Sequence, residues 1–470
     1  MKPLKPTLLA LGVTAALSAC TMAPNYSRPQ VLAPDVPSAM AADNVQAADL
    51  AWQDYFADPR LRALIQAALA RNADLRIATL NAEAARAQYG IARSQLLPSL
   101  GASGSGARVK TSADLSPTGQ ALIAEQYQAG LGVTAWELDL FGRVRSMSNS
   151  AIHQYFAAEY GRDAAQISII AAVAKSYFAE KSAGEIMQYA QDTLKTREES
   201  YRLAKISHDA GVISSIQLNQ SLSQIETAKA GYAAAETMRN AARNALAVLV
   251  GGQLPADLPA GLPLDQQFAG TIPAGLPSDI LNRRPDVRAA EEALQAANAQ
   301  IGAARAAFFP SITLTGSVGS ASYDLDRLFS GPAAAWSFAP QITLPIFTWG
   351  RNKANLDLAH IRTNIAVAQY EQTVQNAFRD AADALNARRT LADQVAAQEK
   401  IATAAADVLH LTELRYRHGI SGSLDLLDAQ RQSFAAQTAL IQSRQQLLNN
   451  RVDVYKVFGG GLEHTAASQQ

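Results

Sequence analysis

An internal repeat constrains this fold more than any other feature of the chain. Residues 84–99, AARAQYGIARSQLLPS, match residues 296–311, AANAQIGAARAAFFPS, at nine of sixteen positions with a spacing of 212. Gly142-Arg143 and Gly350-Arg351 continue the match at a spacing of 208, and so do the Gly-Gly pairs at 251–252 and 459–460. The change in spacing falls in a region expected to contain loops, which tolerate changes in length. The sequence therefore predicts one architecture present twice.

The start of the chain predicts a lipoprotein. Lys2 and Lys5 precede the apolar stretch Leu8 to Leu17, which is too short to span a bilayer as a helix. The sequence LSAC that follows resembles a bacterial lipobox and ends at Cys20, the only cysteine of the chain. We therefore expect a signal peptide over residues 1–19 and lipidation of Cys20, with Thr21 typical of sorting to the outer membrane. The alternative is an ordinary secretory signal with a chance cysteine.

Composition narrows the possible partners. The chain has 41 basic and 41 acidic residues, so no excess of basic charge favours nucleic acid or an anionic membrane surface. No run of about 18 apolar residues follows the signal segment. We therefore expect that any crossing of a membrane uses a closed β-barrel.

In four segments, apolar residues alternate with polar or small ones as they do in barrel strands: about residues 99–109, 127–139, 311–321 and 334–347. In the third segment, Ile312, Leu314 and Val318 alternate with small polar residues. The alternative is a soluble sheet with one exposed face, which alternates in the same way. Together with the lipobox-like sequence, the pattern favours the barrel.

The number of strands predicts an oligomer. A closed barrel needs about eight strands, so four strands in one chain leave two edges exposed to lipid. The chain must combine its strands with those of further copies. A homotrimer would supply twelve strands.

Long helices account for most of the remaining sequence. Asn352 to Tyr416 contains neither proline nor glycine, and its apolar residues recur at helical spacing; residues 143–207 are its counterpart. We expect returning helices over about 213–250 and 423–458, and shorter helices over about 59–96 and 285–308. The alternative is a purely structural coiled coil, which has the same pattern.

One segment carries a specific resemblance. Arg284 to Glu291 reads RPDVRAAE, which resembles the signature of the outer-membrane efflux proteins, the TolC-type channel-tunnels, and in particular their lipid-anchored branch. The resemblance implies an α+β membrane protein in the outer membrane. Its fold is a trimeric, twelve-stranded transmembrane barrel continued by a long periplasmic coiled-coil tunnel. It also implies a periplasmic adaptor protein and an inner-membrane efflux pump as partners, with lipid of the outer membrane around the barrel.

The expected organisation follows from the repeat and the resemblance. After the signal peptide comes an N-terminal extension over 20–57. Repeat 1 then covers 58–252, an equatorial linker 253–283, repeat 2 covers 284–461, and a C-terminal tail 462–470. The hairpin turns near 205–214 and 415–422 would form the periplasmic tip of the tunnel.

The candidate gate lies at that tip. Asp425 and Asp428 are one helical turn apart and share a face. They match the two aspartates that, in the family, surround the periplasmic aperture, and Tyr416 matches a tyrosine of the family's latch between helices. The aspartate that the resemblance implies as partner of that tyrosine is Gln217 here, so the resemblance does not imply a Tyr–Asp bond, and whether Tyr416 forms a latch with Gln217 stays open. The alternative for the two aspartates is that they are solvated residues at a helix start.

The sequence shows no catalytic constellation. None of the six histidines stands in a metal-ligand spacing, so we expect no catalytic residues, no metal site and no cofactor. The resemblance predicts the passive exit duct of a tripartite efflux system. Two other classes stay open: a structural, adaptor-like periplasmic coiled-coil lipoprotein without a pore, and an anchored enzyme, which the missing site disfavours.

Overall fold

The structure is a computed structural model of the 470-residue chain, and it describes residues 22–31, 50–117, 119–269 and 283–460. The chain divides into two compact units. Of the described residues, unit 1 contains those between 22 and 30, 81 and 159, and 289 and 371, and unit 2 contains the others. Several long helices run from one unit into the other. Cys20 lies outside the described residues.

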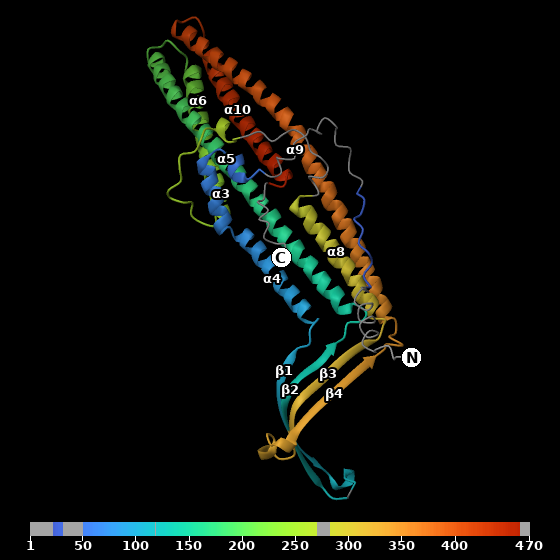
Figure 1. Ribbon diagram of the computed structural model, residues 1–470. Coiled ribbons are helices and arrows are strands. Elements are labelled where there is room, and N and C mark those ends of the chain that lie inside the picture. The colour runs from blue at the N-terminus through green and yellow to red at the C-terminus, as the bar shows by residue number, and fades with distance from the viewer. Residues whose placement is uncertain (1–21, 32–49, 118, 270–282, 461–470) are drawn as a thin grey trace. The chain divides into compact units, whose positions relative to one another are not determined.

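Unit 1 contains a four-stranded antiparallel sheet in the order β1-β2-β3-β4 (Figure 1). The strands are β1 (Leu100–Thr111), β2 (Leu122–Glu137), β3 (Ser311–Ser322) and β4 (Ala334–Thr343). β2 begins five residues before the expected residue 127, because Leu122 still pairs with Thr111 at the end of β1. β4 ends at Thr343, before the expected residue 347, and Pro345 soon after it has no N–H with which to continue the ladder.

The sheet has one apolar and one polar face. Val318 lies opposite Trp336, and the neighbouring pair, Ser317 and Ser337, points to the other side with 2.7 Å between the two Oγ atoms. In the single chain the Trp336 side chain is 80 % exposed. The alternating residues of the sequence therefore lie on opposite faces of the sheet, apolar ones on one face and polar ones on the other. A bulge near Ala135, which has φ 49°, shifts the register between β2 and β3.

The two repeats form helices of identical length. α5 (Arg143–Asp209) and α9 (Arg351–Arg417) each have 67 residues, and α6 (Ser215–Leu249) and α10 (Ser423–Val457) each have 35. Each pair is offset by 208 residues, the spacing read in the sequence. α5 continues through Gly161 and Gly184 without a break. No helix in the described part of the chain combines the length and the apolar character needed to span a bilayer.

The shorter helices keep the other offset of the repeat. α4 (Ala73–Ser94) and α8 (Pro285–Ala306) both have 22 residues and are 212 apart. The single helix expected over 59–96 was wrong, because Asn72 separates α3 (Pro59–Arg71) from α4. Asn72 has extended backbone angles, its Oδ1 accepts from Leu75 N–H, and its Nδ2 donates to the Leu249 carbonyl at 2.8 Å. The remaining short helical turns are Trp52–Tyr55 (α2), Ala113–Leu115, Leu264–Gln266, Leu325–Arg327 and Gly331–Ala333.

An aromatic cluster fixes the non-helical segments of unit 2 to its helices. Tyr55 stacks on Tyr455 of α10 with ring centroids 4.7 Å apart, and Phe56 and Phe268 pack beside them. Tyr55 and Phe56 are neighbours in the chain, whereas Phe268 and Tyr455 come from segments far from them. Tyr55, Phe56 and Tyr455 are buried in this cluster, and such rings bury a large apolar area.

An N-terminal segment, residues 22–30, lies along α8 in unit 1. The Arg28 guanidinium binds both carboxylate oxygens of Glu291, at 2.8 and 2.5 Å. Nearer the end of α8, Arg305 donates to the Met22 carbonyl at 3.3 Å. This segment therefore runs antiparallel to α8, and its first described residue lies at the end of α8 that leads into the sheet.

Candidate functional site

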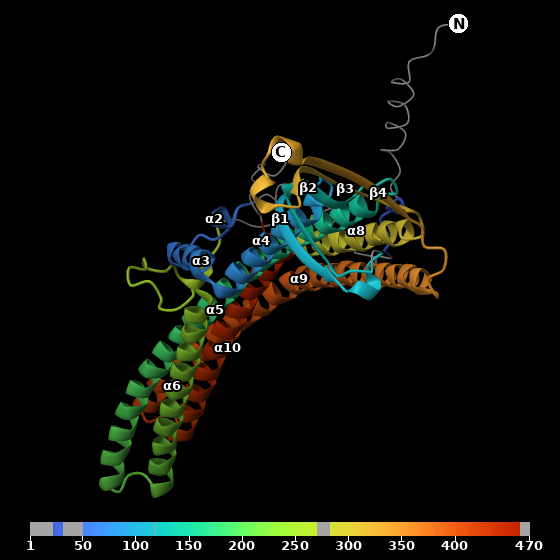
Figure 2. The same ribbon diagram turned by 90° about the horizontal axis from the view of Figure 1, so that it is seen from below.

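The two hairpin turns that join the long helices of unit 2 have the same backbone geometry. Figure 2 shows α6 returning beside the end of α5. Gly211 and Gly419 end α5 and α9 with φ of 74° and 71°, in the left-handed region that favours glycine. Val212 N–H donates to the Ser207 carbonyl, and Ile420 N–H donates to the Arg415 carbonyl, both at 2.8 Å. The repeat therefore builds two equivalent tips.

The first turns of α6 and α10 differ in their caps. At α6, Ser214 Oγ accepts from Gln217 N–H, and the Gln217 side chain accepts from Ser214 N–H at 2.9 Å. At α10, Gly422 replaces the serine, and only the second half of this capping box is present. Asp425 Oδ2 accepts from Gly422 N–H at 3.2 Å. Asp425 thus stands at the position equivalent to Gln217, is exposed, and is held by one oxygen at the helix N-terminus.

Asp428, one turn later, is bound along its own helix. Its Oδ1 accepts from Arg431 Nη2 at 2.6 Å, and its Oδ2 accepts from Gln432 Nε2, also at 2.6 Å. The hydrogen bond from Arg431 is the main cause of a pKa below the usual range of an aspartate. The two predicted gate carboxylates are therefore not equivalent, since Arg431 offsets the charge of Asp428.

A hydrogen bond joins the two tips without Tyr416. Gln217 Nε2 donates to Ser423 Oγ at 3.3 Å, which links the first turn of α6 to the first turn of α10. Tyr416 is half-buried in the last turn of α9, where its carbonyl accepts from Gly419 N–H at 3.0 Å. Within the described residues, no hydrogen bond joins Tyr416 to Gln217. The sequence reasoning missed Ser423, and no local pattern indicates this long-range contact.

A buried arginine lies further along the hairpins from the tip. Arg197 of α5 is 3 % exposed, donates to the Gln224 carbonyl of α6 at 2.8 Å, and places its guanidinium 5.8 Å from the Phe434 ring centre of α10. Burial lowers the pKa of this guanidinium. Among the residues that the structure describes, its Nε has no hydrogen-bond partner. A charge buried in this way is costly unless it contributes to a specific contact.

The structure offers no obvious place for a metal ion in the part of the chain that it describes. Within those residues, no three side chains of His, Cys, Asp or Glu gather as a metal site requires. The charged groups at the tips lie at the surface, and the chemistry that they offer is electrostatic.

Comparison with known proteins places the chain among bacterial efflux proteins. The family model described as "Outer membrane efflux protein" matches residues 64–252 and 276–460. A probable efflux pump outer membrane protein of Pseudomonas putida, TtgC, is 46 % identical over 99 % of this chain and 98 % of its own length. The outer membrane protein OprJ of Pseudomonas aeruginosa is 41 % identical over 97 % of this chain and 95 % of its own. The crystal structure of the open state of the MtrE outer membrane channel of Neisseria gonorrhoeae matches with a TM-score of 0.87 and 49 % identity, covering 94 % of this chain and 99 % of that one.

Proposed function

The chain belongs to the outer membrane efflux protein family, and from that premise we propose how its hairpin tips control passage. It is the outer-membrane channel of an efflux system, with a β-barrel in the membrane and a large periplasmic helical part. Our proposal is that Asp425 and Asp428 of three chains surround the periplasmic aperture, and that the link from Gln217 to Ser423 holds the hairpins in their closed arrangement. The match to channels leaves the alternative of a coiled-coil lipoprotein without a pore unsupported.

The observation that carries this proposal is the position of Asp425. It is exposed in the first turn of α10, and only one of its oxygens is engaged, by Gly422 N–H. A ring of carboxylates around a narrow axis attracts cations and repels anions. Because Arg431 offsets the charge of Asp428, Asp425 should dominate the selectivity of the ring.

Single-channel recording tests this proposal. In planar bilayers, Asp425→Asn should reduce cation selectivity and block by trivalent cations more than Asp428→Asn does, and the double variant should lose most of both. Because asparagine and aspartate side chains have nearly the same size, a change in conductance cannot arise from a wider opening. Unchanged selectivity in the double variant would place the constriction elsewhere, and the two residues would then be solvated residues of a helix start.

A lipid on Cys20 is a second proposal. Met22, two residues later, is held at the sheet end of α8 by Arg305. A lipid attached close to this point would lie near the membrane, where it adds to the anchoring by the barrel. Metabolic labelling with palmitate should mark the wild-type protein and not Cys20→Ala. Equal labelling of both proteins would exclude the anchor.

The partners follow from the same family. We propose that a periplasmic adaptor docks on the hairpin ends and connects them to an inner-membrane pump, and that this chain catalyses no reaction and uses no cofactor. The pump then selects the compounds, and the duct conducts them passively. Crosslinking from a cysteine placed at exposed Val212 in whole cells tests contact with an adaptor. A product containing only further copies of this chain would argue against docking at this tip.

A further inference from the structure

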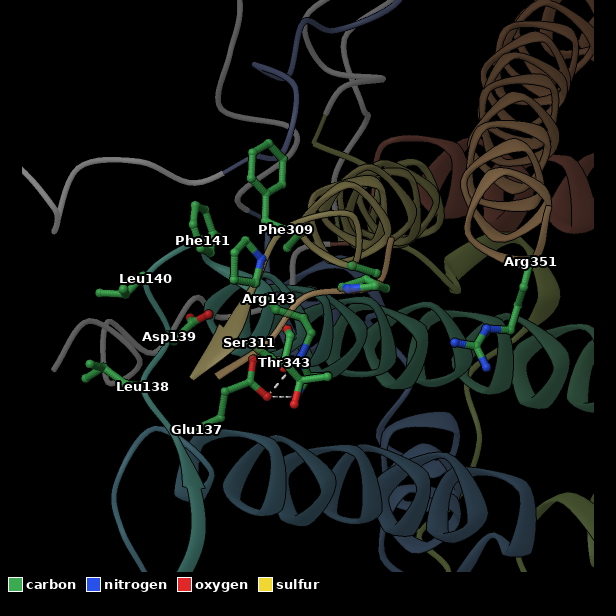
Figure 3. Close-up of a pocket in the computed structure, with 14 residues that line it drawn as sticks. Glu137, Leu138, Asp139, Leu140, Phe141, Arg143, Phe309, Ser311, Thr343 and Arg351 are labelled. Atoms are coloured by element: carbon green, nitrogen blue, oxygen red, sulfur yellow. Dashed lines mark hydrogen bonds and ion pairs between the residues drawn. The ribbon is translucent and has the colours of Figure 1, made fainter. Parts of the chain in front are cut away.

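A cavity of about 300 Å³ lies in unit 1, where the sheet meets the helices. The segment after β2, the segment before β3 and the end of β4 line it (Figure 3). Two ion pairs stabilise one part of this junction: Arg143 with Glu137 at 2.6 Å, and Arg145 with Asp139 at 3.3 Å. Figure 3 shows Arg351 apart from the pair formed by Glu137 and Arg143.

The second repeat keeps the cations of this junction and loses the acids. At the spacing of 208, Arg351 and Lys353 correspond to Arg143 and Arg145, whereas proline and phenylalanine, at 345 and 347, replace Glu137 and Asp139. Arg351 and Lys353 are exposed, and among the described residues neither has a carboxylate partner. The second repeat therefore places two cations at the junction with no carboxylate partner in the described part of the chain; the nearest acid along the chain is Asp357, one turn after Lys353.

The start of α9, which carries both cations, is held in place. Asn352, between them, is buried, and its Nδ2 donates to the Ala307 carbonyl at 2.8 Å. This bond ties α9 to the segment that follows α8. Arg351 and Lys353 therefore project from a fixed backbone, as a binding site requires.

The segment of a neighbouring copy that lies beside the end of β4 does not supply acidic residues in place of the missing ones. Closure of the barrel pairs the free edge of β4 with β1 of the next chain, which places the residues before β1 beside the end of β4. Residues 84–113 contain no Asp or Glu, and Arg86 and Arg93 add positive charge. The junction therefore stays cationic where the two edges meet.

Three exposed apolar residues, Ile346, Phe347 and Trp349, lie just before these cations in the chain, and we call them the apolar collar. Ile346 and Trp349 are 90 % and 88 % exposed in the single chain, and the Phe347 and Trp349 rings meet edge to face with centroids 4.6 Å apart. Aromatic side chains followed directly by cations are typical of a membrane–water interface, where the rings lie at headgroup depth and the cations reach phosphates. The collar and the unpaired cations point to the same kind of ligand.

We propose that Arg351, assisted by Lys353, binds the phosphate of a phospholipid headgroup in the periplasmic leaflet of the outer membrane, with Phe347 and Trp349 against the lipid. A guanidinium offers two parallel N–H donors to a phosphate, which an ammonium does not. The site would fix the depth of the barrel at the start of α9. It is distinct from the gate at the hairpin tips.

Lipid retention by the full trimer tests the site. Trimer in mild detergent is incubated with phosphatidylethanolamine or with a phosphate-free galactolipid, and bound lipid is counted by native mass spectrometry. We expect wild type to retain the phospholipid about tenfold better than Arg351→Gln/Lys353→Gln, the effect of losing one charge-assisted contact. The matched control, Arg76→Gln/Lys400→Gln, removes two exposed cations elsewhere and should behave as wild type.

Further experiments distinguish binding of a lipid from binding of a soluble anion and provide for a variant that does not assemble. Inorganic phosphate should not displace the bound phospholipid, and the galactolipid should not be retained. Displacement by inorganic phosphate would assign the site to soluble anions and overturn the lipid proposal. If the double variant does not form trimers, Arg351→Lys should bind about threefold more weakly than wild type because it keeps the charge but not the fork. Equal retention by wild type, Arg351→Lys and Lys353→Gln would also overturn the proposal.

Discussion

Gln217 donates a hydrogen bond to Ser423 at 3.3 Å, and this bond joins the first turns of α6 and α10. The residue that corresponds to Ser423 in the first repeat, Ser215, lies 3.1 Å from a nitrogen of His208 within its own hairpin instead. The repeat thus places two serines at equivalent positions, and only one of them connects the hairpins. Separation of α6 from α10 must break this bond.

On the proposal that the bond from Gln217 to Ser423 holds the hairpins closed, Ser423→Ala should make that arrangement less stable. A neutral hydrogen bond at a half-exposed site contributes about 1 kcal/mol, so we expect the open population to rise by roughly fivefold per chain. Single-channel recording gives the open probability, and uptake of a large antibiotic by whole cells reports leakage. Ser215→Ala, the matched control in the first repeat, should leave both unchanged. If Ser423→Ala and Ser215→Ala act alike, the bond to Gln217 has no part in closure.

Arg431→Gln should increase the cation selectivity of the closed pore. Loss of Arg431 removes the main cause of the lowered pKa of Asp428 and exposes its charge at neutral pH. Reversal potentials in a salt gradient measure the change. The control is Arg389→Gln, which breaks a similar pair with Asp393 in the middle of α9. No difference between the two variants would show that Asp428 does not face the conduction path.

The same pair predicts a dependence on pH. Because the pKa of Asp428 in the folded chain lies below the usual value of about 3.9, its contribution to stability is present above that value and is lost as pH falls through the lowered pKa. Wild type should thus keep the charge of Asp428 to lower pH than Arg431→Gln does. NMR titration of the full trimer with isotopically labelled aspartates would measure the pKa of Asp428 in wild type and in Arg431→Gln. A lower pKa in the variant would contradict the assignment.

Much of the architecture could be predicted because a repeat and a periodic pattern can both be read directly from the order of residues. The spacing of 208 predicted α5 with α6 and α9 with α10 as equivalent pairs, and the comparisons confirm the outer-membrane efflux family and its fold class. The break at Asn72 was missed because asparagine also occurs within helices. In the structure, its extended backbone and the bond from Leu75 N–H to its Oδ1 show that a new helix begins there.

The candidate site was predicted less completely, for a physical reason. Asp425 and Asp428 were found from spacing along one helix, and the same spacing of three residues could have identified Arg431 as a partner of Asp428. The bond from Gln217 to Ser423 depends on how two hairpins pack, which no local pattern encodes. The roles of Asp425, Asp428, Tyr416 and Cys20 stay predictions.

Arg197 offers a test of a buried charge. At the equivalent position of the second repeat, Ala405 packs beside an apolar cluster that includes Ala402 and Leu440, so this layer of the helices does not require a cation. Arg197→Met should therefore keep or raise the midpoint of thermal unfolding of the trimer, because it fills the space without a buried charge. Arg197→Ala should lower the free energy of unfolding by about 2–3 kcal/mol through the cavity it leaves. Destabilisation by Met equal to that by Ala would show that the charge itself stabilises the hairpins.

The pairing of β2 with β3 depends on two glycines that face each other, Gly130 and Gly319. A Cβ added at Gly319 would lie 2.2 Å from the Ala129 carbonyl oxygen and 2.5 Å from Gly130 Cα, which are backbone atoms that cannot move without distorting the strand. Gly319→Ala should therefore separate the strands locally and reduce the yield of heat-modifiable trimer on gels. Gly101→Ala is the matched control in the same sheet, since a Cβ at that position meets no atom within 4 Å. Normal assembly of Gly319→Ala would show that the sheet can relax at this point, and the close approach would then not be needed for the barrel.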